Sequence, residues 1–373
     1  MKRLLYLSLG VLVLSGCLPV ATDKTEVLNT EEEVETAIIP SIQLDDQYYR
    51  TLLPYKESVT RGTIVSRLNS RYDIKEAESG LLRMSQQQFS PEDYYFQEGQ
   101  KITSEELTSW LRRYDAENNP DGLNPENTLP EGSEERPPAS ILAHVVEQNY
   151  LVKTDEDTIR LGGVSIGLAL NSVYYNRIND VAYEEEIPSS RIVEEGQRMA
   201  NEIVARLREK EGMAKVPIVV GLFKQNSRSA ITPGTYFSYG TAAPEATAVS
   251  NWNAVSEEYV IFPSSRTEEK YRTIDTKVRN FKQATEKYFS NFTSVVGTGF
   301  YQGDELRQLK IEIPIEFYGA AEIIGFTQYV TGLVIEHFPE NIQVEVSVTS
   351  MNGPEALILR KVDQTEPVVH IYD

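Results

Sequence analysis

Residues 141–152, ILAHVVEQNYLV, and residues 158–173, TIRLGGVSIGLALNSV, decide the fold class of this chain. Both runs are rich in Val, Ile, Leu and Tyr, and such residue types are enriched in β-strands. The polar residues 153–157, KTDED, separate the two runs and have the length of a hairpin turn. The pair therefore predicts two long antiparallel strands, which favours an α+β fold over a doubly wound parallel sheet.

Helix signals precede these strands, and helix and strand signals alternate after them. Residues 73–76, DIKE, have the spacing of a capping box and predict a helix to about Gln87. Residues 103–106, TSEE, predict a second helix to Tyr114, and residues 115–138 are rich in turn formers. Apolar spacing predicts helices at 190–211, 266–289 and 320–338, strands at 216–223, 259–262, 292–300, 306–317, 342–349, 357–362 and 368–372, and a loop at 232–250.

Two folded domains are expected after the leader. About 330 residues follow the leader and its polar extension, and a domain usually has about 100 to 200 residues. Residues 184–188, EEEIP, interrupt the pattern and mark the expected boundary. We therefore expect an α+β chain with mostly antiparallel or mixed sheets and packed helices. Its segments are a signal peptide at 1–16, a lipidated, disordered acidic tether at 17–40, an N-terminal domain at 41–187 and a C-terminal domain at 188–373.

The first seventeen residues carry an export signal. Lys2 and Arg3 precede an apolar run of about eleven residues, which is shorter than the roughly twenty that a spanning helix needs. The lipobox Leu14, Ser15, Gly16, Cys17 then places small residues before the only cysteine of the chain. The pattern predicts cleavage before Cys17 and lipidation of its thiol, with acyl chains such as palmitate as the membrane anchor. The alternative is an ordinary signal peptide with an incidental cysteine.

The strong negative charge limits the possible partners. The formal net charge is -20, and loss of Lys2 and Arg3 with the signal peptide brings the mature chain to -22. An acidic surface repels phosphate backbones, so we expect no nucleic-acid partner. No cysteine follows Cys17, so the mature chain forms no internal disulfide. These properties fit a protein held by its lipid on the outer face of a Gram-positive cytoplasmic membrane.

One motif is compatible with catalysis. Gly163-Val164-Ser165-Ile166-Gly167 fits the G-x-S-x-G pattern of a serine hydrolase, which needs a strand, a sharp turn and a helix. The residues after Gly167 continue as strand-forming material, so a glycine-containing strand explains the motif as well. An envelope hydrolase using Ser165, with His337 or His370 to complete it, is therefore an alternative function.

The sequence predicts no cofactor and no metal site. The histidines His144, His337 and His370 lack partners at ligand spacing, and Gly297-Thr298-Gly299 with Gly303 misses the dinucleotide-binding spacing. Aromatic residues near loops are the best indication of a ligand surface, with core packing as the alternative. These aromatic residues are Tyr174, Tyr175, Tyr236, Phe237, Tyr239 and Trp252.

Four sequence strings resemble a known family. They are residues 61–73, RGTIVSRLNSRYD, residues 89–100, FSPEDYYFQEGQ, residues 122–125, GLNP, and residues 161–171, LGGVSIGLALN. Together with the lipobox, they resemble the CamS family of staphylococcal and bacillar sex-pheromone precursor lipoproteins over nearly the whole chain.

The resemblance implies two products. In this family the cleaved signal peptide is trimmed within the membrane, and a short apolar peptide then acts as a conjugation pheromone on enterococcal cells. The matching peptide here is Gly10, Val11, Leu12, Val13, Leu14, Ser15, Gly16. Expected partners are the membrane, through the lipid on Cys17, then signal-peptide and intramembrane peptidases, and an extracellular ligand or protein. The body is expected to be non-catalytic, with a solute-binding lipoprotein as a further alternative.

Overall fold

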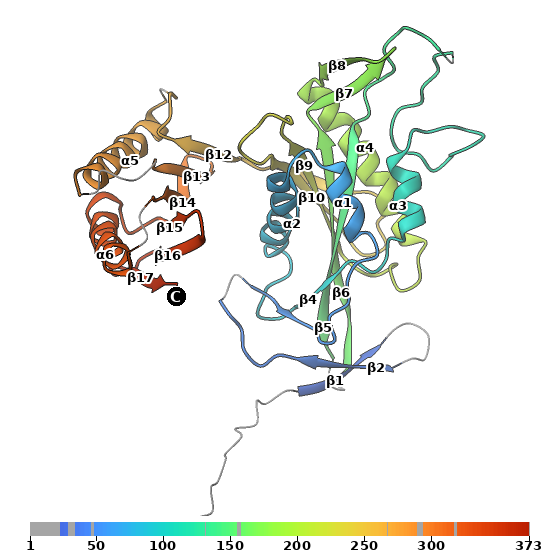
Figure 1. The fold of residues 1–373 in the computed structure, drawn as a ribbon. Coiled ribbons are helices and arrows are strands. Elements are labelled where there is room, and N and C mark those ends of the chain that lie inside the picture. The colour runs from blue at the N-terminus through green and yellow to red at the C-terminus, as the bar shows by residue number, and fades with distance from the viewer. Residues whose placement is uncertain are drawn as a thin grey trace, which may run out of the picture.

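The structure, a computed structural model, contains two large β-sheets with helices packed against them and a small two-stranded sheet (Figure 1). It describes residues 23–28, 34–45, 48–130, 132–154, 158–266, 268–288, 294–316 and 319–372. The architecture is mixed α+β with mostly antiparallel pairing, which confirms the predicted fold class. No helix within these ranges is both long and apolar enough to cross a bilayer.

The predicted hairpin is the centre of the larger, nine-stranded sheet. Its strands β5 (Leu142–Lys153) and β6 (Thr158–Asn171) pair antiparallel along nearly their whole length. β9 (Ile218–Gln225) joins β6 in parallel, and a parallel neighbour requires a crossover, here through α4 (Ser189–Arg208). The remaining strands are β1 (Asp23–Leu28), β2 (Val34–Ile39), β3 (Arg50–Thr51), β4 (Tyr95–Glu98), β10 (Thr235–Ala242) and β11 (Ser250–Ala254).

Helices cover both faces of the larger sheet. α2 (Arg71–Ser85), preceded by α1 (Arg61–Arg67), packs on one face, and α3 (Ser104–Leu111) packs with α4 on the other. Successive strand residues point to opposite faces, so neighbouring residues of β5 serve both layers. Beside the sheet, β7 (Val173–Ile178) and β8 (Val181–Glu186) form a separate hairpin that the sequence reading missed.

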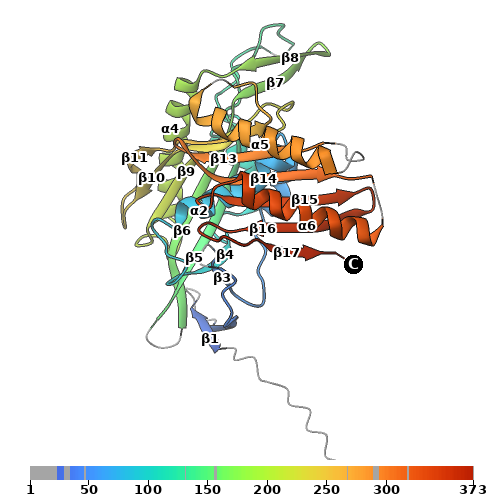
Figure 2. The same cartoon turned by 90° about the vertical axis from the view of Figure 1, so that its left-hand side faces the viewer.

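The smaller sheet contains six strands in sequence order. α5 (Glu269–Tyr288) and α6 (Ala320–His337) lie over one face of it, and Figure 2 shows both helices in front of the strands. Pairing is antiparallel except between the two strands that α6 connects. The strands are β12 (Glu257–Phe262), β13 (Val296–Gln302), β14 (Glu305–Pro314), β15 (Gln343–Ser350), β16 (Gly353–Arg360) and β17 (Val368–Ile371).

The larger sheet continues through the expected domain boundary between residues 187 and 188. β9 pairs with β6, and α4 lies in the same apolar core as both strands. The change from one sheet to the other lies instead between Ala254, the end of β11, and Glu257, the start of β12. The acidic run at 184–186 belongs to the β7–β8 hairpin, so its polarity reflects an exposed strand rather than a linker.

Two further segments contain more regular structure than expected. The prediction of a loop at 232–250 is wrong, because β10 lies within it. The buried face of β10 includes Ser238, Gly240 and Ala242, so no alternating apolar pattern marks the strand in the sequence. Within the expected tether, β1 and β2 form an antiparallel hairpin, and β1 also pairs with β6. The predicted signal peptide, Cys17 and the candidate peptide lie outside the described residues.

Candidate functional site

An open pocket of about 300 Å³ lies between α1, α2 and the sheet face formed by β4 and β5. This volume is at the lower end of the range for small-ligand sites, about 300 to 1,000 Å³. We name it the α1–α2 pocket. It is lined by Ser58, Thr60, Arg61, Ile64, Lys75, Glu78, Ser79, Leu82, Phe96, Glu98, His144, Val145, Val146, Glu147 and Gln148.

The periodicity of helix and strand brings these residues together. The lining residues of α2 stand at intervals of three, four and seven from Lys75 and therefore share one face of the helix. On the sheet, Phe96 and Glu98 are alternate residues of β4, and His144, Val146 and Gln148 are alternate residues of β5. β4 and β5 are hydrogen-bonded neighbours, with Glu98 opposite Gln148, so both sets form one floor.

The start of α2 positions its side of the pocket. The Ser70 hydroxyl accepts a hydrogen bond from the backbone N–H of Asp73 and caps the helix. The helix therefore begins at Arg71, slightly earlier than the sequence predicted, with Asp73 in its first turn. Residues 103–106 form the predicted capping box of α3.

At one end of the pocket, the carboxylate of Glu98 already has three partners. Glu98 accepts hydrogen bonds from the Ser58 backbone N–H at 2.7 Å and from the Tyr55 hydroxyl. Arg61 on α1 adds an ion pair with 3.6 Å between its Nη1 and Glu98 Oε1. Burial, followed by the negative charge of Glu98, raises the pKa of Tyr55 to about 12, so this hydroxyl stays a donor at neutral pH. Glu98 thus holds the 55–61 segment over the sheet.

Two other side chains at the pocket, Glu78 and His144, lack hydrogen-bond or ion-pair partners of this kind. The carboxylate of Glu78 accepts no hydrogen bond and forms no ion pair with the residues that the structure describes. Burial, with repulsion by Glu98, raises its pKa. On the floor, His144 is only 2% exposed, and its Nδ1 has no hydrogen-bond partner in the described part of the chain. Burial, with the positive charge of Arg67, lowers the pKa of His144 to about 4, so its ring is neutral at physiological pH.

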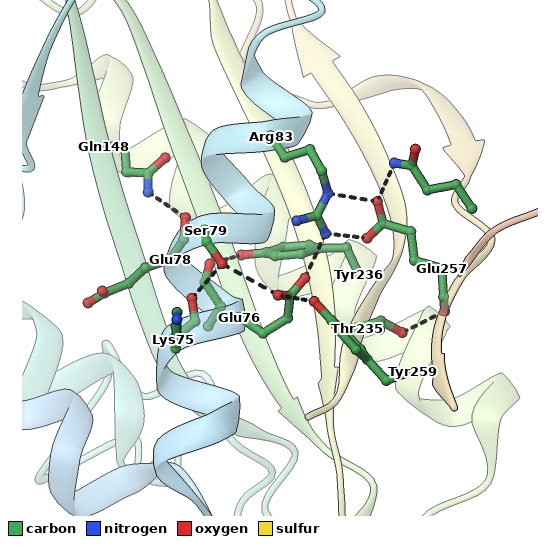
Figure 3. Close-up of polar contacts among 12 residues, drawn as sticks. Lys75, Glu76, Glu78, Ser79, Arg83, Gln148, Thr235, Tyr236, Glu257 and Tyr259 are labelled. Carbon is green, nitrogen blue, oxygen red and sulfur yellow. Dashed lines mark hydrogen bonds and ion pairs between the residues drawn. The ribbon is translucent and has the colours of Figure 1, made fainter. Parts of the chain in front are cut away.

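The opposite side of α2 connects the two sheets. Figure 3 shows Arg83 between two carboxylates, Glu76 of α2 and Glu257 of β12, with Glu78 pointing away from this group. The guanidinium lies 2.6 Å from Glu76 and 2.7 Å from Glu257, and it stacks on Phe300 with 4.6 Å to the ring centroid. The Tyr259 hydroxyl donates to Glu76 at 2.6 Å. Burial alone would lower the pKa of Arg83, but the two carboxylates raise it, so the cation is permanent.

The similarity of this chain to a known protein family extends over most of this architecture. A family model described as CamS sex pheromone cAM373 precursor matches residues 55–366, which include both sheets and the α1–α2 pocket. The chain belongs to the CamS family. This confirms the resemblance that the four sequence strings indicated.

Two solved structures of sex pheromone precursors are similar to this chain. One is the crystal structure of a sex pheromone precursor from Lactobacillus salivarius subsp. salivarius UCC118, with a TM-score of 0.82 and 26% identity, covering 89% of this chain and 98% of that one. The other is the C-terminal domain of the sex pheromone staph-cAM373 precursor from Staphylococcus aureus, with a TM-score of 0.69 and 29% identity, covering 82% and 99%. Curated proteins give no significant match.

Ser165 does not occupy a nucleophile elbow in this CamS-family chain. It lies in the middle of β6, is fully buried, and is hydrogen-bonded to the Ser85 hydroxyl at 2.6 Å. His337 ends α6 and His370 lies on β17, both in the smaller-sheet body. The G-x-S-x-G glycines instead allow close packing, since a Cβ at Gly163 would lie 2.3 Å from the Phe89 ring.

The structure separates the other candidate residues. Tyr236 is buried against α2 and donates to the Ala77 carbonyl, while Phe237 and Trp252 pack against the core on the other face. Tyr175 lies on β7 with Arg228 over its ring, so the six aromatic residues do not form one surface. Among the described residues, no group of His, Cys, Asp and Glu is arranged to hold a metal ion.

Sequence reasoning missed the α1–α2 pocket. The available signal was a histidine and a glutamine four residues apart, and so on one face of the strand, in 144-HVVEQ-148. Polar residues on a strand face that is otherwise buried indicate either a partner or a cavity.

Proposed function

We propose that this chain is the precursor of a cell-surface lipoprotein and of a short apolar peptide, and that its folded body works by binding. Membership of a pheromone-precursor family supports the precursor role. The lipobox that ends at Cys17 supports lipid attachment and a place on the outer face of the cytoplasmic membrane. The peptide is the segment 10–16, GVLVLSG, which precedes the cleavage point.

One observation carries the proposal that the body binds rather than catalyses. Ser165, the nucleophile candidate, is fully buried and accepts a hydrogen bond from the Ser85 hydroxyl, whereas the open α1–α2 pocket contains no serine paired with a histidine as base. A pocket with apolar walls and a few uncompensated polar groups is typical of a ligand site.

Three measurements test the proposal. Mass spectrometry of the culture supernatant is expected to find a peptide that ends at Gly16, and its absence would refute peptide release. The Cys17→Ala protein is expected to carry no lipid and to be lost from the membrane fraction. Fractionation with membranes equal to that of the unmodified protein would refute lipid anchoring. A serine-reactive fluorophosphonate is expected to leave the protein unlabelled, with Ser165→Ala as the matched control. Labelling that disappears in this variant would favour the hydrolase instead.

A further inference from the structure

The charges around the α1–α2 pocket are unequal. Glu98 already has three partners, and Arg61 lies between Glu98 and Glu57. Glu78, at the rim, receives neither a hydrogen bond nor an ion pair from the described residues, including Lys75 one turn before it on α2. Glu78 is exposed at this rim and has no counter-charge among the described residues, so it can pair with a bound cation without giving up a protein partner.

The interior of the pocket is suited to an apolar group. Ile64 of α1, Leu82 of α2 and Phe96 of β4 form its walls. His144 on the floor presents a neutral ring whose Nδ1 has no partner among the described residues. A neutral imidazole nitrogen can accept a hydrogen bond from, or donate one to, an amide group. The pocket therefore offers a carboxylate, apolar walls and an imidazole nitrogen without a partner among the described residues.

We infer that the α1–α2 pocket binds a primary ammonium group that is joined to a branched apolar body and an amide. The ammonium group pairs with Glu78, the apolar body packs between Ile64 and Phe96, and the amide meets His144. This is the chemistry of the amino end of a short apolar peptide and of a single apolar amino-acid amide. The inference rests on the proposed binding role of the body, but not on lipidation of Cys17 or release of a peptide.

Isothermal titration calorimetry on the full-length protein in a mild detergent tests this site. The probes are leucyl-valyl-leucinamide, its N-acetylated form and leucinamide, each titrated also into detergent alone. N-acetylation replaces the ammonium group by a neutral amide and adds a small acetyl group, so the free tripeptide is expected to bind about fivefold more tightly than the acetylated one. Leucinamide distinguishes the two kinds of ligand. If the tripeptide binds more tightly than leucinamide, the site is assigned to the end of a peptide. If the two bind equally, the site is assigned to an amino-acid amide.

Matched variants locate the effect. Glu78→Gln keeps the helix propensity of its exposed position and is expected to remove the advantage of the free amine. Glu194→Gln makes the same change at an exposed position of α4, on the other face of the sheet, and is expected to bind like the unmodified protein. Equal binding of the free and acetylated peptides, no binding of either, or an unchanged preference in Glu78→Gln would overturn the inference. Detection of lipid on Cys17 in the same preparation would keep the precursor function separate from this result.

Discussion

Protonation of His144 is expected to destabilise the part of the chain that contains the larger sheet as the pH falls. The pKa of His144 is about 4 in the folded chain, and an unperturbed histidine has a pKa of about 6.5. Between these values the unfolded chain binds a proton that the folded chain does not bind. The free energy of unfolding therefore decreases with falling pH, and the difference reaches about 2.5 kcal/mol near pH 4.5.

Urea denaturation followed by tryptophan fluorescence measures this effect. Both tryptophans, Trp110 and Trp252, pack in or against the core of the larger body, so their fluorescence reports its unfolding. His144→Leu has a similar volume and no titrating group, while the carboxylates titrate in both proteins. The unmodified protein should lose about 2.5 kcal/mol more than His144→Leu between about pH 7 and pH 4.5. Equal losses in the two proteins would refute a neutral, buried His144.

Three further substitutions test the packing and polar contacts. Arg83→Met leaves Glu76 and Glu257 without their cation. We therefore expect the free energy of unfolding, measured by urea denaturation, to fall by about 3–5 kcal/mol, and proteases to cleave faster between the sheets. Stability and protease resistance equal to those of the unmodified protein would contradict this. Gly163→Ala forces a Cβ against the buried Phe89 ring and should cost about 1–3 kcal/mol by thermal denaturation, whereas the open position Gly62 tolerates alanine. Asn124→Ala removes four hydrogen bonds to backbone groups, so we expect the free energy of unfolding to fall by more than about 1 kcal/mol. A smaller decrease would show that these bonds do not stabilise the loop.

Local sequence signals predicted the elements whose residues interact with near neighbours. The β5–β6 hairpin has two apolar runs around a polar turn, and the α3 capping box lies within four residues. The strand β10 was not predicted, because its buried face contains Ser238, Gly240 and Ala242, which pack against neighbours that the sequence does not identify. The sheet that continues across the expected boundary at 187/188 depends on the parallel pairing of β6 with β9, which joins segments about fifty residues apart.

The α1–α2 pocket depends on contacts that a single sequence does not encode locally. Glu78, Glu98 and His144 come from a helix and two strands, and only the tertiary fold brings them to one cavity. The Arg83 contact with Glu257 likewise joins residues 174 positions apart. The predicted lipobox is the opposite case, because its pattern is contained in four consecutive residues.

The mass of the mature amino-terminal peptide tests the central claim most directly. Protein purified from membranes of the producing cells is digested, and the peptide that begins at Cys17 is measured by mass spectrometry. The account predicts a chain without residues 1–16 whose Cys17 carries a diacylglyceryl group. A mature chain that begins elsewhere, or an unmodified Cys17, would contradict the claim that this protein is a lipoprotein precursor.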